Sequence, residues 1–205
     1  MNNRYIILSA QIISTLFTPF YMPTVAFVVL LTFSYLRQLA IGEKIYMVTL
    51  IYMFTVLFPR VIIYFYRKHN GWSREQLSKR SNRYAPYLIS IVCYSTLLII
   101  MSAIHMPRFT MSIVAASLLI QFVCATINNW MKVSFHAASS GGVIGMLFAF
   151  SLIFNFNAVW WIALCIFLCG CVCAARMTLR QHTYKELLVG VVVGILSGWM
   201  TVILI

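Results

Sequence analysis

Hydrophobic residues along this chain fall into seven long stretches separated by short polar segments. Each stretch is long enough to cross a bilayer as an α-helix, which takes about 17 to 25 residues. None shows the alternation of an outer-membrane barrel, and isolated strands would leave backbone groups unpaired in lipid. The pattern predicts an all-α, polytopic membrane bundle of six to seven transmembrane helices. The stretches are Tyr5 to Leu36, Ile45 to Tyr66, Tyr87 to Ile104, Phe109 to Ile127, Ala137 to Phe156, Ala158 to Ala175 and Leu187 to Ile205.

The first and last stretches carry additional signals. The first is longer than one span needs and contains Pro19 and Pro23, and proline kinks or breaks a helix. It is therefore either one kinked span or a short entry helix followed by a span. In the last stretch, Gly190, Gly194 and Gly198 recur every four residues. They lie on one helical ridge, which predicts the close approach of a neighbouring helix.

Composition supports a membrane location and an anionic partner. The chain is 62% hydrophobic and 9% charged, against about 25% charged residues in soluble domains. It has 15 Lys and Arg residues and three acidic residues, which gives a formal net charge of +12. The basic residues border predicted spans rather than forming a soluble domain. The expected partners are therefore the lipid bilayer and a phosphate-bearing lipid, not nucleic acid.

Two other features argue against a cleaved signal peptide and against a metal site. Only Arg4 precedes the first apolar stretch, which is too long for a cleavable signal peptide, so we expect it to be retained. All six cysteines lie in apolar segments, four of them in one predicted span and with no His or acid near them. Their spacing fits no zinc pattern, which favours small packing residues and no metal.

The polar residues gather in three short stretches: Arg67 to Arg83, Asn128 to His136 and Arg176 to Glu186. Two predicted spans separate each stretch from the next. An even number of crossings returns a chain to the same side of the membrane. The three stretches can therefore meet at one end of the bundle and form a shared site.

The third stretch has the most specific spacing. Arg176 lies six residues before His182, and Glu186 lies four residues after it. On a helix, His182 and Glu186 would share a face. A carboxylate bound to one imidazole nitrogen fixes the tautomer and makes the other nitrogen a better nucleophile or base. Arg176 could then hold an anion. The alternative interpretation is a capping or interfacial cluster.

The first two stretches offer further candidates. Ser134 and His136 precede a run of small residues, Ala137 to Gly142, at the start of the fifth span. Backbone donors at this helix start could cradle a phosphate, or the run could simply allow close helix packing. The first stretch ends in a basic cluster before the third span, and such clusters commonly anchor lipid headgroups. The cluster comprises Arg74, Lys79, Arg80 and Arg83.

Taken together, the three stretches resemble a divergent branch of the type 2 phosphatidic acid phosphatase family. These membrane lipid phosphate phosphatases are related to soluble vanadium haloperoxidases. Their third motif is Ser-Arg, five residues, His, three residues, Asp. Here Arg176, His182 and Glu186 keep that spacing, with Ala175 in place of Ser and Glu in place of Asp.

The other two motifs match less closely. The second family motif is Pro-Ser-Gly-His, and this chain has Val133, Ser134, Phe135 and His136, which keeps Ser and His. The first motif is Lys, six residues, Arg, Pro, and the stretch from Arg67 to Arg83 follows it only loosely.

The resemblance covers Lys79 to Gly190 and implies a phosphatase-like catalytic membrane core at 79–205. Residues 1–78 would form N-terminal membrane helices and an interfacial loop. The implied activity is metal-independent and cofactor-free hydrolysis of a phosphomonoester or terminal phosphate of a membrane lipid. By that resemblance His182 forms a phosphohistidine, Glu186 orients it, and His136 protonates the leaving oxygen and then activates water. The implied phosphate-binding residues are Arg80, Arg83, Ser134 and Arg176, with Lys79 as a weaker candidate.

Two other functions use the same features. A transporter for an anionic lipid or solute also needs basic residues at the mouth of a bundle. Paired helix breaks in the two halves of the chain would favour a transporter. The only early break is at Pro19 and Pro23, and the second half has no corresponding one. A catalytically inactive, lipid-binding relative is the third alternative. The resemblance implies a bacterial inner membrane with the site on the outer face, although the positive-inside rule favours the opposite orientation. The lipid substrate and the oligomeric state stay open.

Overall fold

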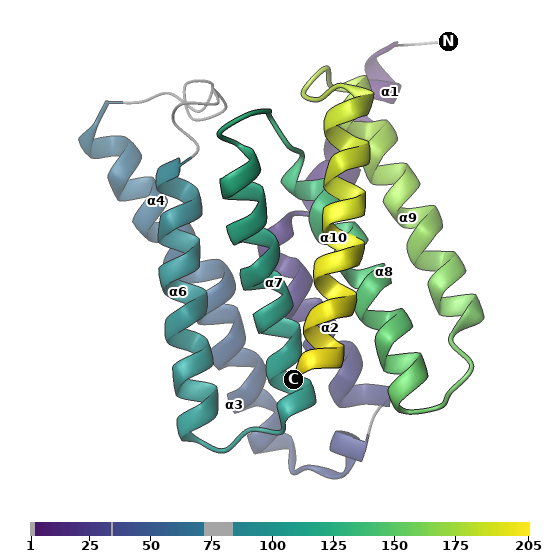
Figure 1. Ribbon diagram of the computed structural model, residues 1–205. Helices are drawn as coiled ribbons and strands as arrows, with labels where there is room; N and C mark the ends of the chain where they lie inside the picture. Colours follow the sequence, from purple (N-terminus) through teal and green to yellow (C-terminus); the bar gives the residue numbers. More distant parts are fainter. Residues whose placement is uncertain (1–2, 34, 72–83) are drawn as a thin grey trace.

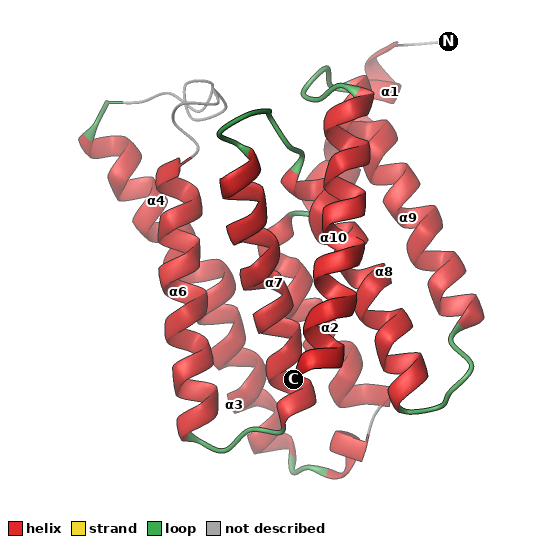
Figure 2. Ribbon diagram, viewed as in Figure 1, coloured by secondary structure: helices red, strands yellow, loops and turns green. Residues whose placement is uncertain are grey.

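A computed structural model describes residues 3–33, 35–71 and 84–205, and this part of the chain is helical with no strand (Figures 1 and 2). Seven helical segments in it are long and apolar enough to cross a membrane. They indicate an integral membrane protein and confirm the predicted all-α class. The elements are α1 (Asn3–Leu16), η1 (Pro19–Tyr21), α2 (Met22–Phe33), η2 (Tyr35–Gln38), α3 (Ile41–Tyr52), η3 (Met53–Leu57), α4 (Phe58–His69), α6 (Tyr84–Ala103), α7 (Arg108–Ile127), α8 (Phe135–Ile153), α9 (Val159–Thr178) and α10 (Tyr184–Leu204).

The first span is a single broken crossing rather than an entry helix plus a separate span. The segment Arg4–Thr32 is 29 residues long, and the break falls at the short 3-10 turn η1, which starts at Pro19. Proline cannot continue the hydrogen-bond ladder of the preceding helix. The chain therefore changes direction between α1 and α2 while still crossing once (Figure 1).

The second span is also irregular. Its two α-helices, α3 and α4, are joined by the π-helical turn η3, and Pro59 follows immediately in the first turn of α4. Pro59 has no N–H to give to the carbonyl four residues earlier, which belongs to Thr55. The Tyr94 hydroxyl, from α6, donates to that carbonyl oxygen at 3.5 Å. A neighbouring side chain thus takes over part of the lost backbone bond.

Polar side chains join these two irregular spans inside the apolar region. The hydroxyls of Thr24 and Thr55 lie 3.1 Å apart. Arg60 donates from Nη1 to the Tyr21 hydroxyl at 2.6 Å, and its guanidinium carbon lies 4.5 Å from the centre of the Tyr21 ring. Since lipid offers no hydrogen-bond partners, such groups satisfy each other.

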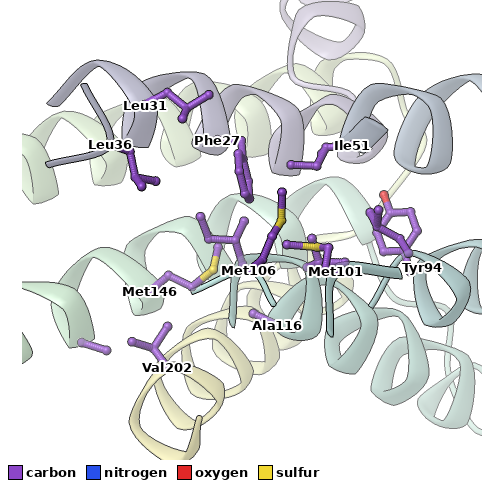
Figure 3. Close-up of a cluster of buried hydrophobic side chains, with 14 of the residues drawn as sticks. Phe27, Leu31, Leu36, Ile51, Tyr94, Met101, Met106, Ala116, Met146 and Val202 are labelled. Atoms are coloured by element: carbon purple, nitrogen blue, oxygen red, sulfur yellow. The ribbon is translucent and has the colours of Figure 1, made fainter. Parts of the chain in front are cut away.

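A hydrophobic core fills the space between α2, α3, α6 and α7. Phe27, Ile51 and Leu97 are completely buried there, as is Met101. Figure 3 shows side chains from these helices converging on one layer, with Met146 of α8 and Val202 of α10 beside it. The N-terminal spans are therefore part of one bundle with the C-terminal helices.

The helices α8 and α10 pack backbone against backbone, as the glycine spacing predicts. A Cβ on Gly194 would lie 2.0 Å from the Ala138 carbonyl oxygen, and one on Gly198 would lie 2.4 Å from that of Gly142. From the other side, a Cβ on Gly145 would lie 2.1 Å from the Ile195 carbonyl oxygen. Only glycine permits this approach, which brings the starts of the two helices together.

Candidate active site

The second and third polar stretches lie at one end of the bundle, as the even number of intervening spans predicts, and so do the described residues on either side of the undescribed part of the first stretch, 69–71 and 84. The end of α4, the start of α6, the α7–α8 connection and the α9–α10 connection all lie there (Figure 1). Hydrogen bonds link the segments at this end. Tyr84, the first residue of α6, donates from its hydroxyl to the Asn129 side-chain oxygen. Lys132 donates from Nζ to the Gln181 carbonyl oxygen at 2.7 Å.

A tight reversal between α9 and α10 positions the third stretch. Arg180 has a left-handed backbone with φ 51°. Its N–H bonds to the Met177 carbonyl at 2.9 Å, and the Gln181 N–H bonds to the Arg176 carbonyl at 3.1 Å. This pair of bonds is the Schellman ending of a helix. It turns the chain so that α10 starts within four residues and runs back along the bundle.

The start of α10 is capped by Thr183, whose hydroxyl accepts from the Glu186 N–H at 3.5 Å. A threonine cap followed three residues later by glutamate is a known helix-start signal. In the usual capping box the glutamate side chain returns to the cap residue's own N–H. Here the Glu186 carboxylate bonds to His182 instead. Both interpretations of this stretch therefore apply: the Glu186 backbone N–H takes part in the helix cap, and the Glu186 carboxylate pairs with His182.

His182 and Glu186 form a close ion pair at this end of the bundle. Nδ1 of His182 lies 2.6 Å from Oε2 of Glu186, and the two side chains are 2% and 18% exposed. His182 precedes the helix rather than lying on it, because Thr183 is the cap. With Nδ1–H donating to the carboxylate, Nε2 becomes the ring nitrogen suited to attack an electrophile or to take a proton.

The second stretch is joined to this pair through the backbone. The N–H of Ser134 donates to the Glu186 carbonyl oxygen at 3.3 Å, so the start of α8 is tied to the first turn of α10. The Ser134 hydroxyl is completely buried and caps α8 by accepting from the Ala137 N–H at 3.4 Å. His136 follows in the first turn of α8 and is half-buried.

The run of small residues that follows His136 serves packing. The hydroxyls of Ser139 and Ser140 each donate to the His136 carbonyl at 3.0 Å. A Cβ on Gly141 would lie 2.4 Å from the Val191 carbonyl oxygen of α10. Of the two interpretations open at the sequence level, close helix packing is the one that applies to the glycines. The first turn of α8, with Ser134 and His136, remains next to the His182 region.

Arg176 lies in the last turn of α9, and its side chain is hydrogen-bonded to α1, a helix outside the three motifs. Its Nη1 donates to the Ser14 hydroxyl of α1 at 2.9 Å. Ser14 is buried. Neither its residue type nor its position, 162 residues away, signals this contact in the sequence. Lys132 was likewise missed, although it lies within the second stretch and its bond to Gln181 braces two connections.

The basic cluster of the first stretch falls outside the described residues. Lys79, Arg80 and Arg83, predicted as phosphate ligands, are all in that segment, and so is the predicted boundary between residues 78 and 79. These assignments stay predictions.

Comparisons of this chain with protein-family models, with curated proteins and with solved structures found no match. What can be said of its function therefore rests on the residues themselves.

Proposed function

We propose that this protein is a metal-independent phosphatase of membrane lipids, built on a phosphatidic acid phosphatase type 2 core. One observation carries the proposal: the 2.6 Å contact between His182 Nδ1 and Glu186 Oε2, with the imidazole side chain 2% exposed. A buried histidine oriented by a carboxylate is the arrangement that nucleophilic catalysis needs. It lies at the connection between α9 and α10, at the same end of the bundle as the connection between α7 and α8 (Figure 1).

The proposed reaction has two steps. In the first, His182 Nε2 attacks phosphorus, the bond to the lipid oxygen breaks, and protonated His136 gives its proton to that oxygen. In the second, neutral His136 takes a proton from water, the resulting hydroxide attacks phosphorus, and the phosphorus–nitrogen bond breaks. Inorganic phosphate leaves and His182 is restored. His136 thus acts first as acid and then as base, while Glu186 holds the His182 ring throughout.

Basic and hydroxyl groups would bind the nonbridging phosphate oxygens. Guanidinium groups are suited to this because their planar donors match two oxygens at once and neutralise developing charge. Arg176, anchored by Ser14, is the described residue best suited to this role. The Ser134 hydroxyl oxygen accepts the helix-cap bond from the Ala137 N–H. Its O–H is therefore the group proposed to donate to phosphate. The remaining proposed ligands are Arg80, Arg83 and Lys79.

Exposed apolar side chains on or beside the two connections that carry the site, Trp130, Met177 and Tyr184, favour a lipid substrate over a soluble phosphate ester. The substrate would present its phosphate at the membrane surface while its chains stay in the bilayer. We place the site on the outer face of a bacterial inner membrane as part of the proposal, because several of the basic residues there are assigned to phosphate rather than to topology.

The test is phosphate release by the purified full-length protein from phosphatidic acid and several other lipid phosphates, in the presence of a chelator. We expect release by the wild type and none by His182→Ala. The control is His105→Asn at the opposite end of the bundle, which should keep wild-type activity because asparagine tolerates the left-handed backbone of His105, φ 54°. Full activity in His182→Ala would refute the proposed mechanism.

A second variant tests the orienting role of the carboxylate. Glu186→Gln should lower kcat roughly 10²- to 10⁴-fold, because a neutral amide neither fixes the reactive tautomer nor stabilises the charged ring. Glu43→Gln, at an exposed position in the first turn of α3, is the matched control and should have no effect. If the wild type binds lipid phosphates but releases phosphate from none of them, a transporter or an inactive relative becomes the better explanation.

A further inference from the structure

A groove between α2 and α3 opens at the end of the bundle opposite the candidate active site. It has a volume of about 700 Å³, within the ~300 to 1,000 Å³ of typical small-molecule sites. Its walls are mostly apolar and come from both helices. They comprise Val28, Leu31, Thr32, Ile45, Val48 and Thr49.

Two basic residues, Arg37 and Lys44, complete the lining. Lys44 donates from Nζ to the Arg37 carbonyl oxygen at 2.5 Å, which holds its ammonium beside η2. An ammonium has three N–H donors, so this bond occupies one of them. The Arg37 side chain is exposed. In the described part of the chain it has neither a hydrogen-bond partner nor an ion-pair partner.

The charge at this end of the groove is not neutralised by an acid in its lining. Glu43 precedes Lys44 in sequence but does not line the groove. Successive residues on a helix point about 100° apart, so the Glu43 carboxylate and the Lys44 ammonium leave the helix in different directions. The groove therefore combines apolar walls along the spans with two cations near the ends of the two candidate spans.

We propose that this groove binds one anionic phospholipid. Its phosphodiester would accept hydrogen bonds from the Arg37 guanidinium and the Lys44 ammonium, and one acyl chain would lie along Val28, Leu31 and Val48. Charge complementarity supports this occupant, because basic residues at the ends of membrane spans attract anionic lipids and only a lipid also supplies a chain for the apolar walls. The bound lipid would brace α2 against α3. The site is independent of the proposed catalysis.

The test is native mass spectrometry of the full chain released from detergent in the presence of phosphatidylglycerol or phosphatidylcholine. We expect the wild type to retain one phosphatidylglycerol with higher affinity than phosphatidylcholine. Arg37→Gln should weaken phosphatidylglycerol binding about fivefold, the contribution of one basic residue near an anionic headgroup, and leave phosphatidylcholine binding unchanged. The matched control is Arg108→Gln, an exposed position at the start of α7 at the same end of the bundle.

A second variant addresses the acyl-chain part of the groove. Val48→Trp adds bulk to a wall residue and should reduce retention of both lipids, provided that size-exclusion chromatography shows a folded protein; Val48→Ile is the alternative if it does not. Equal affinity of the wild type for the two lipids would overturn the proposal. So would an Arg108→Gln variant that loses as much phosphatidylglycerol binding as Arg37→Gln does.

Discussion

The C-terminal pair α8 and α10 and the N-terminal spans α1 to α4 hold to the bundle by different means. Between α8 and α10 the contact is backbone against backbone, made possible by glycines such as Gly145 and Gly194. The N-terminal spans are interrupted at Pro19 and at the π-turn before Pro59. They are joined by side-chain hydrogen bonds such as that of Arg60 with Tyr21.

The difference bears on how the candidate site is built. Backbone contacts leave no rotamer freedom, so the starts of α8 and α10, with Ser134 and Glu186, are held in a fixed relation. Side-chain contacts across broken helices can adjust more easily. The N-terminal spans are also linked to the site region, through Ser14 and Arg176. The comparison predicts that mutations in the two regions have effects of very different size.

The largest effect is expected from Gly194→Ala. Its new methyl group would lie 2.0 Å from the Ala138 carbonyl oxygen, so α8 and α10 must separate, at a cost of about 3 kcal/mol or more in the free energy of unfolding. We expect a large fall in Tm and in the yield of monodisperse protein. The control is Gly170→Ala on α9, where a Cβ meets nothing within 4 Å. Equal Tm values for the two variants would contradict the backbone-contact interpretation.

A smaller effect is expected from Ser14→Ala in the lipid phosphatase assay. Loss of the hydroxyl removes an acceptor for the Arg176 guanidinium, and a hydrogen bond is worth about 1 kcal/mol. We expect KM for the lipid phosphate to rise about fivefold with little change in kcat, and Ser14→Thr to restore it. Ser9→Ala is the control, since that exposed hydroxyl bonds only within its own helix, to the Ile6 carbonyl. A change in Tm without a change in KM would make Ser14 a purely structural residue.

The smallest effect is expected for the pair of Arg60 and Tyr21. A double-mutant cycle with Tyr21→Phe and Arg60→Met should give a coupling free energy of about 0.6 kcal/mol, the average for polar contacts between membrane helices. The measurement is unfolding of the purified protein in mixed micelles. A coupling energy of zero would show that the 2.6 Å contact adds nothing to the cohesion of the N-terminal spans.

Much of the fold was predictable because span length and hydropathy are local properties. The helices of the structure match the predicted apolar stretches, and the glycine spacing in the last stretch correctly predicted a close helix contact. The interruptions were harder. Pro19 predicted a break in the first helix. Whether α1 and α2 then form one membrane crossing depends on how they pack against the other helices. The π-turn before Pro59 depends on neighbours such as Tyr94, which the local sequence does not specify.

For the candidate site, the sequence by itself determined the contacts between residues close in the chain, and the even span count placed the second and third polar stretches on a common side of the bundle. The spacing of four brings Glu186 to His182, and the even number of spans brings the stretches to one end. Tertiary structure alone decided that Ser134 bonds to the first turn of α10 and that Ser14 holds Arg176. Such contacts depend on how each helix is rotated about its axis. That rotation is set by where two helices can approach, which is a property of the pair and not of either sequence segment.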